Sequence, residues 1–505
     1  MGVRPASALL IGALLTSVLA GCSLAPAYAP PAIAVPQTYA HVDGWAPAAP
    51  ADTLSRGPWW ERFGDPVLNG LEAQIEGQNP QLAAALARYD QARGFEAEAR
   101  ADLFPTIGAE ASASANRQSA DRPLRGKAQP DYYGAQQVDG VFGYEIDLWG
   151  RVRNEVASRK ALAQASKDDA ASIRLSLQAE LADDYMQLRG LDAQAELLRS
   201  TIDAYQKAYD LTEAQYQGKV GTVADVSRAQ NQLSMAKAQL SDEGASRALL
   251  EHAVAVLVGH TASDFSLPAA TPDLQPPPIP VGLPSTLLQR RPDVASAERS
   301  VFSANREIGV AKAAFFPTIT LTGIGGFQAS HTNLLSLSNT FWSLGPGVTL
   351  PIFEGGRLKA RESEAYGRFR ETSANYRSIV LEAFRQVEDA RAQLDWLGRE
   401  SQDVDTAVAA SQQALDAALA LYRDGGADYL GVVTAQTALL QAQQAALQLH
   451  TRRLQADVAL VRAVGGGWTV SDLPTPTWTA AAGAADPSGP PAADSASLQT
   501  AKERP

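Results

Sequence analysis

The chain has 505 residues, of which 45% are hydrophobic, and it carries a formal net charge of −12 at pH 7. This composition excludes an intrinsically disordered chain, and the acidic balance argues against nucleic acid as a partner. The only apolar run that looks like a targeting or spanning segment lies at the N-terminus.

Residues 1–21 have the features of a signal peptide. Arg4 precedes an apolar run from Ala8 to Leu19, which is too short to span a bilayer, and small residues follow it. The single cysteine, Cys22, comes directly afterwards, and Leu19-Ala-Gly-Cys22 resembles the lipobox of bacterial lipoproteins, whose cysteine receives lipid. The next residue is Ser23 rather than an aspartate, which resembles the lipoproteins that are sorted to the outer membrane.

Residues 22–66 are predicted to form a lipidated, extended segment, because Ser23 to Ser55 is rich in Pro and Ala and shows little periodicity. The Trp59-Trp60 pair that follows is interpreted as packing rather than ligand stacking. One helix is predicted from about Val67 to Leu103, where Phe104-Pro105 ends it.

Two alternating segments follow, at residues 106–117 and 138–149, with a polar loop from Ser119 to Gln137 between them. Each alternates apolar side chains with small, polar or acidic ones, which suits either a sandwich core or a transmembrane barrel with a wet lumen. A sandwich needs more strands than the chain offers, so the barrel is favoured. Glu145 and Asp147 would make a lumen acidic and mildly cation-favouring, or would simply solubilise it.

A helical hairpin is predicted for residues 151–259, with its reversal at Gln217 to Thr222. No proline interrupts Arg151 to Leu267, and apolar residues recur every three or four positions along the first arm. That arm would be roughly 100 Å long at about 1.5 Å per residue.

The second half of the chain repeats the first. Asn79-Pro80 corresponds to Arg291-Pro292 at an offset of 212 residues, and Gly259 corresponds to Gly465 at an offset of 206. The predicted units are a first repeat at 67–260, a linker at 261–291, a second repeat at 292–465, and a C-terminal segment at 466–505 with a disordered tail. The second repeat is predicted to contain a helix, two strands at 318–328 and 341–352, and a helical hairpin at 355–464.

Four strands of this length cannot close a barrel, because bacterial barrels begin at about eight strands. The chain must therefore oligomerise to satisfy its strand edges. A trimer would supply about twelve strands above about twelve helical rods, which together make a tube. The predicted fold class is an α+β membrane protein of this kind.

The chain resembles the TolC-type outer membrane factors, and in particular the lipid-anchored, NodT-like efflux lipoproteins. The residues that carry the resemblance are the lipobox at Cys22, Trp59-Trp60, Phe63-Gly-Asp-Pro66, Leu68-Asn69, Phe104-Pro105, Tyr144-Glu-Ile-Asp-Leu-Trp-Gly-Arg151, Arg290-Arg-Pro-Asp293, Phe316-Pro317, Pro351-Ile-Phe-Glu-Gly-Gly-Arg357 and Tyr422-Arg-Asp-Gly425. The resemblance implies a homotrimeric channel of the outer membrane with a twelve-stranded barrel and a periplasmic α-helical barrel. It also implies docking on a periplasmic adaptor and an inner-membrane RND-type pump, for export of drugs or other small molecules.

The resemblance places a gate at the tips of the two hairpins, where the matching residues are Tyr216, Tyr422, Arg423, Asp424 and Asp428. The predicted adaptor-docking residues are Gly218, Lys219, Gly221, Thr222, Gly425 and Gly426, with glycines permitting the reversals. Thr222 and Asp428 also stand where helix N-caps belong, and for Asp428 capping is favoured over gating. Asp424 has no such role and is the better gate candidate. Thr434 stands where related channels often carry an aspartate, so we expect this gate to be held more weakly or by other contacts.

No enzyme site is predicted. The five histidines lack metal-ligand spacing, the glycine runs lack the context of a phosphate loop, and no nucleophile has a recognisable base partner. No cofactor is expected beyond the lipid on Cys22. The alternatives to efflux are a type I secretion channel and a non-conducting coiled-coil lipoprotein, although the latter leaves the strands unexplained.

Overall fold

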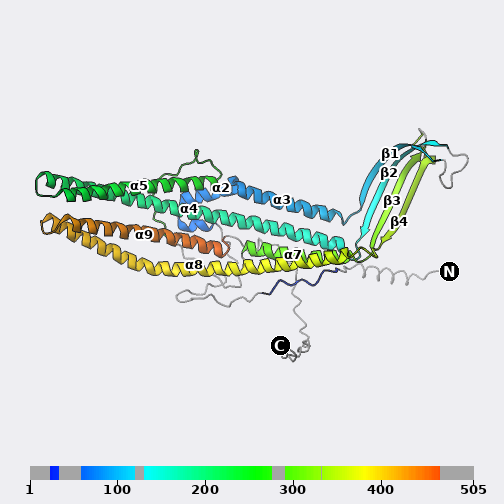
Figure 1. The fold of residues 1–505 in the computed structure, drawn as a ribbon. Coiled ribbons are helices and arrows are strands. Elements are labelled where there is room, and N and C mark those ends of the chain that lie inside the picture. The colour runs from blue at the N-terminus through cyan, green and yellow to red at the C-terminus, as the bar shows by residue number, and fades with distance from the viewer. Residues whose placement is uncertain (1–22, 33–57, 120–129, 276–290, 331–332, 467–505) are drawn as a thin grey trace, which may run out of the picture.

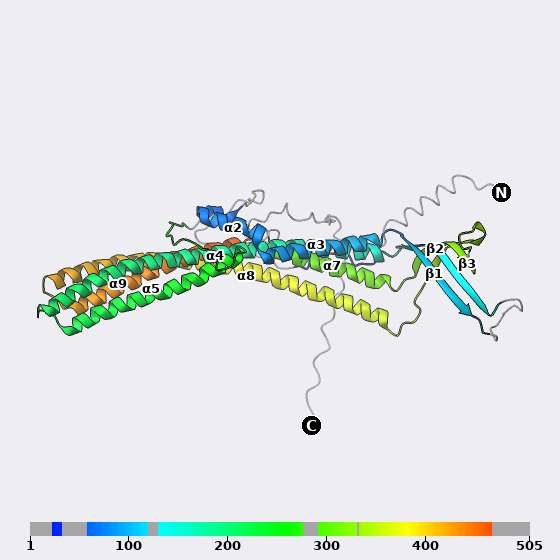
Figure 2. The ribbon, with the colours of Figure 1, turned by 90° about the horizontal axis from the view of Figure 1, so that it is seen from above.

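The computed structural model describes residues 23–32, 58–119, 130–275, 291–330 and 333–466. The predicted signal peptide, Cys22, residues 276–290 of the linker and the C-terminal tail lie outside the described residues. The described chain is an elongated layer of helices with a curved sheet at one end (Figure 1). Hairpin tips lie at the opposite end of the helical layer (Figure 2).

The elements of the two halves match in length. The long helices α4 (Arg151–Gln217) and α8 (Arg357–Arg423) have 67 residues each, and their return helices α5 (Val223–Leu257) and α9 (Tyr429–Ala463) have 35 each. Ahead of the sheet's two hairpins, α3 (Pro80–Ala101) and α7 (Pro292–Ala313) have 22 residues each. Bounds therefore differ by 206 or 212 between the halves.

The first helical region is two helices rather than the single one predicted for 67–103. Helix α2 (Pro66–Gln78) ends at Asn79, and α3 begins at Pro80. The Asn79 side chain accepts hydrogen bonds from the amides of Gln81 and Leu82 and donates one to the carbonyl of Leu257. An asparagine cap followed by proline at the first helical position starts a new helix and interrupts the preceding one.

Four antiparallel strands form one sheet in the order β1 (Thr106–Arg117), β2 (Tyr132–Ile146), β3 (Thr318–Ala329) and β4 (Thr340–Thr349). The register aligns Ile107 with Phe142, Phe142 with Gly323 and Gly323 with Leu344. Residues paired in register share a face, so the alternation in each strand produces one continuous apolar face and one polar face.

Three predicted strand bounds are wrong by three residues or more. The second strand begins at Tyr132, not 138, because residues 132–137 pair with β1 up to Arg117 although their sequence predicts a loop. It ends at Ile146, not 149, since the Trp149 indole turns aside to donate to the carbonyl of Pro317 (2.8 Å) and stack on Phe316. The last strand stops at Thr349 rather than 352.

The helices form a layer whose order follows that of the strands. Next to the sheet the sequence of neighbours is α3, α4, α7, α8, and towards the tips α5 and α9 replace α3 and α7 as partners of the long helices (Figures 1 and 2). The largest apolar cluster lies midway, where η1 (Trp59–Phe63) and α2 cover α4. None of the described helices combines the length and the apolar composition required to cross a membrane.

Candidate functional site at the helical tips

Both hairpins reverse through the same backbone motif. At the end of α4 the amide of Lys219 donates to the carbonyl of Tyr216 and that of Val220 to Gln215, while at the end of α8 Gly425 donates to Tyr422 and Gly426 to Leu421. This pair of bonds is the Schellman motif, whose first residue after the cap takes a left-handed conformation. In the second hairpin that residue is Gly425, with φ 71°.

In the first hairpin the left-handed residue is Lys219, with φ 60°, and not Gly218, whose φ is −72°. Glycine therefore does not take the left-handed position at the end of α4. Gly221 serves a different purpose, because a Cβ there would lie 3.1 Å from the Tyr216 amide nitrogen. The left-handed position that Gly425 fills in the second hairpin is thus filled in the first by Lys219, whose backbone is strained there.

Lys219→Gly is expected to stabilise the α4 tip by about 1 kcal/mol, since a side chain in the left-handed region costs roughly that much. The Val220 amide, which is bonded across the turn, should then exchange with solvent about fivefold more slowly. Gly425→Ala is the matched change of opposite sign and should accelerate exchange at Gly426. Equal exchange rates in wild type and both variants would show that neither turn depends on this conformation.

Thr222 and Asp428 cap the return helices. The Thr222 hydroxyl accepts from the Asp225 amide at 3.2 Å and donates to the Asp225 carboxylate at 2.6 Å, and Asp428 accepts from the Gly431 amide at 3.3 Å. The expected capping of α5 and α9 is therefore present. In a full capping box the acidic side chain reaches back to the backbone, whereas here it meets the threonine hydroxyl.

Tyr422 links the two hairpins within the chain. Its hydroxyl donates to the Gln215 side-chain oxygen on α4, and its ring packs on Tyr429 with centroids 5.4 Å apart. A second link lies a few turns further from the tip, where the side-chain amide of Gln232 donates to the carbonyl of Val433 and to Thr437 Oγ1, each at 3.2 Å. Sequence reasoning missed Gln215, Gln232 and Tyr429. All three differ from their counterparts at the offset of 206, which are Leu421, Ala438 and Val223.

The remaining gate candidates are exposed. Tyr216, Arg423 and Asp424 all face solvent, and Asp424 is the C-cap residue of α8. Within the described part of the chain, no ion pair joins Arg423 to Asp424 or to Asp428. The structure therefore brings Tyr422 alone of the five candidates into a contact between the hairpins.

Glu145 and Asp147 lie at the junction between sheet and helix. Glu145 accepts two hydrogen bonds from the Arg151 guanidinium, at 2.8 and 2.7 Å, and Asp147 lies just beyond the end of β2. The Asp147 carboxylate accepts from the backbone amide of Arg153 at 2.9 Å and from its side chain at 3.2 Å. Both carboxylates are neutralised by the first turn of α4.

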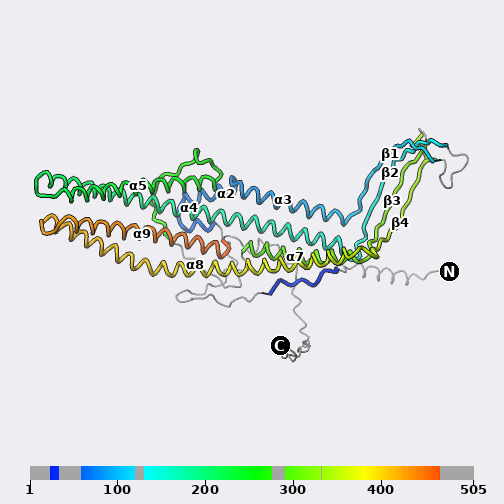
Figure 3. The backbone as a smooth tube through the Cα atoms, viewed as in Figure 1, coloured from blue at the N-terminus to red at the C-terminus, as the bar shows by residue number. Residues whose placement is uncertain are grey.

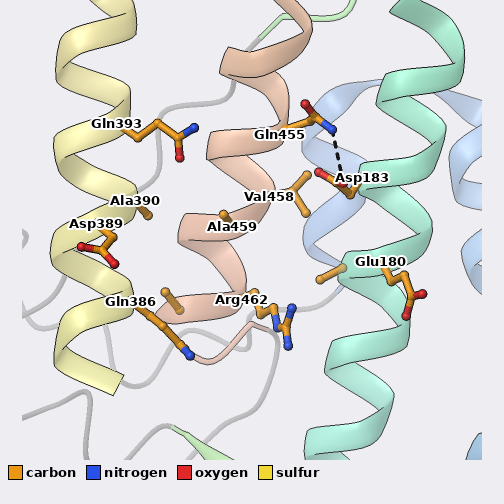
Figure 4. Close-up of a pocket in the computed structure, with 12 residues that line it drawn as sticks. Glu180, Asp183, Gln386, Asp389, Ala390, Gln393, Gln455, Val458, Ala459 and Arg462 are labelled. Atoms are coloured by element: carbon orange, nitrogen blue, oxygen red, sulfur yellow. Dashed lines mark hydrogen bonds between the residues drawn. The ribbon is translucent and has the colours of Figure 1, made fainter. Parts of the chain in front are cut away.

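A polar groove of about 490 Å³ crosses the middle of the helical layer (Figure 4). It is formed by α4, α8 and α9, and its polar lining residues are Glu180, Asp183, Gln386, Asp389, Gln393, Gln455 and Arg462. The Asp183 carboxylate accepts from Gln455 at 3.2 Å. Burial raises the pKa of Asp183, and burial together with repulsion from Asp183 and Glu180 raises the pKa of the neighbouring Asp184 to about 6.

Comparison with known proteins identifies the class to which this architecture belongs. The model of a family described as outer membrane efflux protein matches residues 71–260 and 283–466. The chain is 31% identical over 462 residues to the pyoverdine export outer membrane protein OpmQ of Pseudomonas aeruginosa, covering 89% of this chain and 95% of that protein. It is 29% identical over 455 residues to the cation efflux system protein CusC of Escherichia coli, with 89% and 96% covered.

Solved structures agree. The outer-membrane channel OprN superposes with a TM-score of 0.82 at 29% identity, over 88% of this chain and all of that one. A CusC structure superposes with a TM-score of 0.78 at 27% identity and the same coverage. The chain belongs to the outer membrane efflux protein family, and it is an outer-membrane component of an efflux system.

Proposed function

We propose that the chain forms the exit duct of a tripartite efflux system, as a homotrimer whose sheets close a transmembrane barrel above a periplasmic α-helical barrel. The observation that carries the proposal is the pairing of one sheet, apolar on one whole face, with a helical layer continuous with it. Membership of the efflux family and the matched lengths of the two halves, which fit an internal repeat, support it.

The edges of the chain support closure with further copies. Strands β1 and β4 are the outer strands of the sheet, and α3 and α8 border the helical layer on the same two sides. Large apolar side chains are exposed on these bordering helices, including Phe95 on α3 and Trp396 on α8, at 51% and 65%. Unpaired strand edges and exposed aromatic side chains are costly in a monomer and are satisfied when copies close a ring.

The two faces of the sheet fit a barrel wall. Ile107 and Trp342 on the apolar face are 82% and 81% exposed, as lipid-facing side chains must be in a single chain. Glu145 belongs to the polar face, which would line the lumen. Because Arg151 and Arg153 neutralise Glu145 and Asp147, these two carboxylates solubilise and orient the junction rather than make the lumen cation-favouring.

The cargo is proposed only at the level of small molecules. Relatives are described by different cargoes, with pyoverdine for OpmQ, cations for CusC and toluene for TtgC of Pseudomonas putida, which is 32% identical. Because relatives with the same fold are named for such different cargoes, the fold alone does not fix which small molecule passes through this chain. The proposed partners are a periplasmic adaptor, docked on the tip residues 218–222 and 425–426, and an inner-membrane pump.

The test of the duct is the mass of the detergent-extracted protein by light scattering, with bilayer conductance measured on the same sample. A conducting trimer is expected. A monomer or dimer without conductance would refute the barrel and favour a coiled-coil scaffold.

For the gate we propose that the Tyr422–Gln215 bond helps to hold the tips closed. Tyr422→Phe keeps the ring on Tyr429 but removes the hydroxyl. At about 1 kcal/mol for one hydrogen bond per protomer, a trimer loses about 3 kcal/mol, so the open population should rise about 100-fold. Single-channel recordings of the variant should show correspondingly more open time. Arg423, Asp424 and Asp428 would act in the gate through contacts between protomers.

The repeat supplies a matched control for this experiment. Tyr216 is the counterpart of Tyr422, is exposed, and makes no side-chain hydrogen bond in the described chain. Tyr216→Phe is expected to leave the recordings unchanged, and Gln215→Ala to reproduce Tyr422→Phe. Equal opening by both tyrosine variants would exclude the bond as the lock.

We also propose a lipid anchor on Cys22. It is supported by the lipobox and by the next residue, Ser23, whose hydroxyl donates to Asn154 in the first turn of α4. Cys22→Ser should abolish palmitate labelling in cells. Undiminished labelling would refute the anchor.

A further inference from the structure

The polar face of the sheet carries two carboxylates that lie directly opposite each other. Strands β1 and β2 run side by side at one edge of the sheet (Figure 3), and their register pairs Glu110 with Asp139. Opposed residues of an antiparallel pair have Cβ atoms roughly 5 Å apart, and like charges in that position destabilise the sheet. The pair is therefore stable only with a positive charge close to both carboxylates.

Asp139 is buried, and its hydrogen bonding is incomplete. The residue is 4% exposed, and its Oδ1 accepts from the side-chain amide of Gln137 at 2.7 Å. Its Oδ2 is also buried and has no hydrogen-bond partner among the described residues. A buried carboxylate oxygen without a partner is costly, so this oxygen points to a ligand that the described side chains do not supply.

A glycine brings the backbone of β3 against Asp139 on the other side. Gly326 pairs with Asp139, and a Cβ on this glycine would lie 2.7 Å from Asp139 Cβ and 2.1 Å from the carbonyl oxygen of Val138. Both distances are well inside van der Waals contact, so no side chain can stand at position 326 beside the carboxylate. On the β1 side Glu110 is exposed, and its carboxylate is free to turn towards Asp139.

No basic side chain faces the pair within the sheet. In the described strands β1 to β4 the one basic residue is Arg117, which lies on the apolar face with its guanidinium over the Tyr132 ring, 5.6 Å from the centroid. Arg151 is out of reach, because it binds Glu145, which lies roughly 20 Å along β2 from Asp139. The described sheet therefore leaves the two carboxylates without a counter-charge.

Joining further copies edge to edge does not supply a counter-charge either. Within the chain, Gly143 of β2 pairs with Thr322 of β3. The repeat offsets of 206 and 212 relate this pair to Thr349 of β4 and Glu110 of β1, the two edge strands. If neighbouring chains join as β2 joins β3, Glu110 meets the partner subunit's Thr349. A threonine hydroxyl is a further oxygen ligand and carries no charge.

We propose that Glu110 and Asp139 bind a hard divalent cation of the calcium class on the polar face of the sheet, with one site per chain. Calcium takes carboxylate, amide and water oxygens at about 2.3–2.6 Å in flexible geometry, and two opposed carboxylates can bridge it. No group of three or more acidic, histidine or cysteine side chains in the described part of the chain could hold a metal ion. Two carboxylates and water must therefore suffice, and a dissociation constant of about 0.1–1 mM follows.

The site itself depends only on the sheet, whereas its consequence rests on the duct proposed above. In a closed barrel the polar face lines the lumen, and three copies of the site would lie at one level. Unoccupied, the six carboxylates would attract cations and repel anions. Occupied, they would be largely neutralised, so the preference of the duct for cations should depend on the calcium concentration.

The binding experiment uses full-length, detergent-extracted protein that has been stripped with EDTA and dialysed. Mn²⁺ is the probe, and the electron paramagnetic resonance signal of free Mn²⁺ measures how much is bound. Wild type should bind one Mn²⁺ per chain more than Glu110→Gln or Asp139→Asn, and excess Ca²⁺ should displace it. Glu110 is exposed on an edge strand, so Glu110→Gln tests the site even where Asp139→Asn does not fold.

Glu145→Gln is the matched control for binding. It removes the same charge from the same face of β2, but the Glu145 carboxylate already accepts two hydrogen bonds from Arg151. This variant should bind Mn²⁺ as wild type does. Equal binding by wild type, Glu110→Gln and Asp139→Asn would overturn the site, as would a wild-type protein that binds no Mn²⁺ after stripping.

The second experiment measures the cation-to-anion permeability ratio in neutral phosphatidylcholine bilayers, from the reversal potential in a KCl gradient. Adding 5 mM CaCl₂ after EDTA should lower the wild-type ratio at least twofold. Glu110→Gln should begin at a lower ratio and should not respond to calcium. An equal response in Glu110→Gln would place the calcium elsewhere and overturn the proposal.

Two further outcomes separate the site from its rivals and from the duct. A ratio that follows pH between 5 and 8 but not calcium would replace the cation by a proton shared between the carboxylates, against the proposal. Mn²⁺ binding at Glu110 and Asp139 in a protein that does not conduct would refute the duct and leave the site standing. Conduction without this binding would do the reverse.

Discussion

Replacing Glu72 by methionine is expected to raise the free energy of unfolding at pH 7 by about 3 kcal/mol. Glu72 lies on the inward face of α2 with Leu68 and Ile75 and is 0% exposed, and among the described residues neither of its carboxylate oxygens has a hydrogen-bond partner. Burial without a partner raises its pKa to about 9. The folded protein must therefore hold this side chain protonated at neutral pH.

The sign of the pH dependence follows from the direction of the shift. Below about pH 4.5 Glu72 is neutral in both the folded and the unfolded chain, so it contributes no pH dependence. Between that pH and about 9 only the folded state keeps the proton, so stability falls by about 1.4 kcal/mol per pH unit as the pH rises. Glu72→Met removes this loss, and its advantage over wild type should shrink on going from pH 7 to pH 4.

Thermal and denaturant unfolding of the detergent-extracted protein at several pH values measures the effect. Glu76→Gln is the control on the same helix, because Glu76 is exposed and its pairing with Arg174, at 3.2 Å, is a surface ion pair of small value. If the advantage of Glu72→Met is the same at pH 4 and pH 7, the carboxyl is not protonated in the folded state, and the buried-acid account fails.

The helical framework could be predicted from the sequence because its signals are local. Periodicity, the absence of proline from 151 to 267 and a constant offset of 206 define the hairpins, and α4 ends at Gln217, where the sequence predicts the reversal. The start of β2 could not be predicted, because residues 132–137 do not alternate between apolar and polar side chains and are held in the strand by pairing with β1. Strand pairing depends on residues far away in the sequence, and a stretch without alternation inside a long strand has the same local pattern as a loop.

The tip residues show the same division. The capping roles of Thr222 and Asp428 are local and follow from their spacing. The strain at Lys219 is hidden in the sequence because two glycines flank the position and the usual preference points to them. The bond from Tyr422 to Gln215 joins residues 207 positions apart, and no repeat symmetry relates its two ends. Local chemistry is therefore readable from the sequence, whereas the contacts between hairpins require coordinates.

A charged cluster that binds the start of the linker, and which we call the clasp, has no counterpart in the second half, so the repeat could not predict it. Asp192 on α4 accepts from Arg189 at 2.8 Å, from Arg247 on α5 at 2.6 Å and from the backbone amide of Ala270 at 3.1 Å. The two guanidinium groups also donate to the carbonyls of Pro268 and Leu267, at 2.9 and 2.6 Å. At the offset of 206 the counterpart of Asp192 is Gly398, so only the first half carries the clasp.

Asp192→Ala is expected to lower the free energy of unfolding by about 3–5 kcal/mol, which is the cost of leaving buried charges unpaired. The Asp192 side chain is 2% exposed and that of Arg189 5%, so water cannot replace the lost carboxylate without opening the structure. Residues 267–270 should detach first, and their amides should lose protection against hydrogen exchange before α4 or α5 does.

Asp395→Ala is the matched control, because Asp395 pairs with Arg399 at 3.1 Å on the exposed surface of the other long helix. Such a pair contributes less than about 1 kcal/mol. Asp192→Asn keeps an acceptor but not the charge and should fall between the two alanine variants. If Asp192→Ala and Asp395→Ala cost the same, the cluster is solvated in solution, and the linker must be held by the packing of Leu267 and Leu274 in the central apolar cluster rather than by charge.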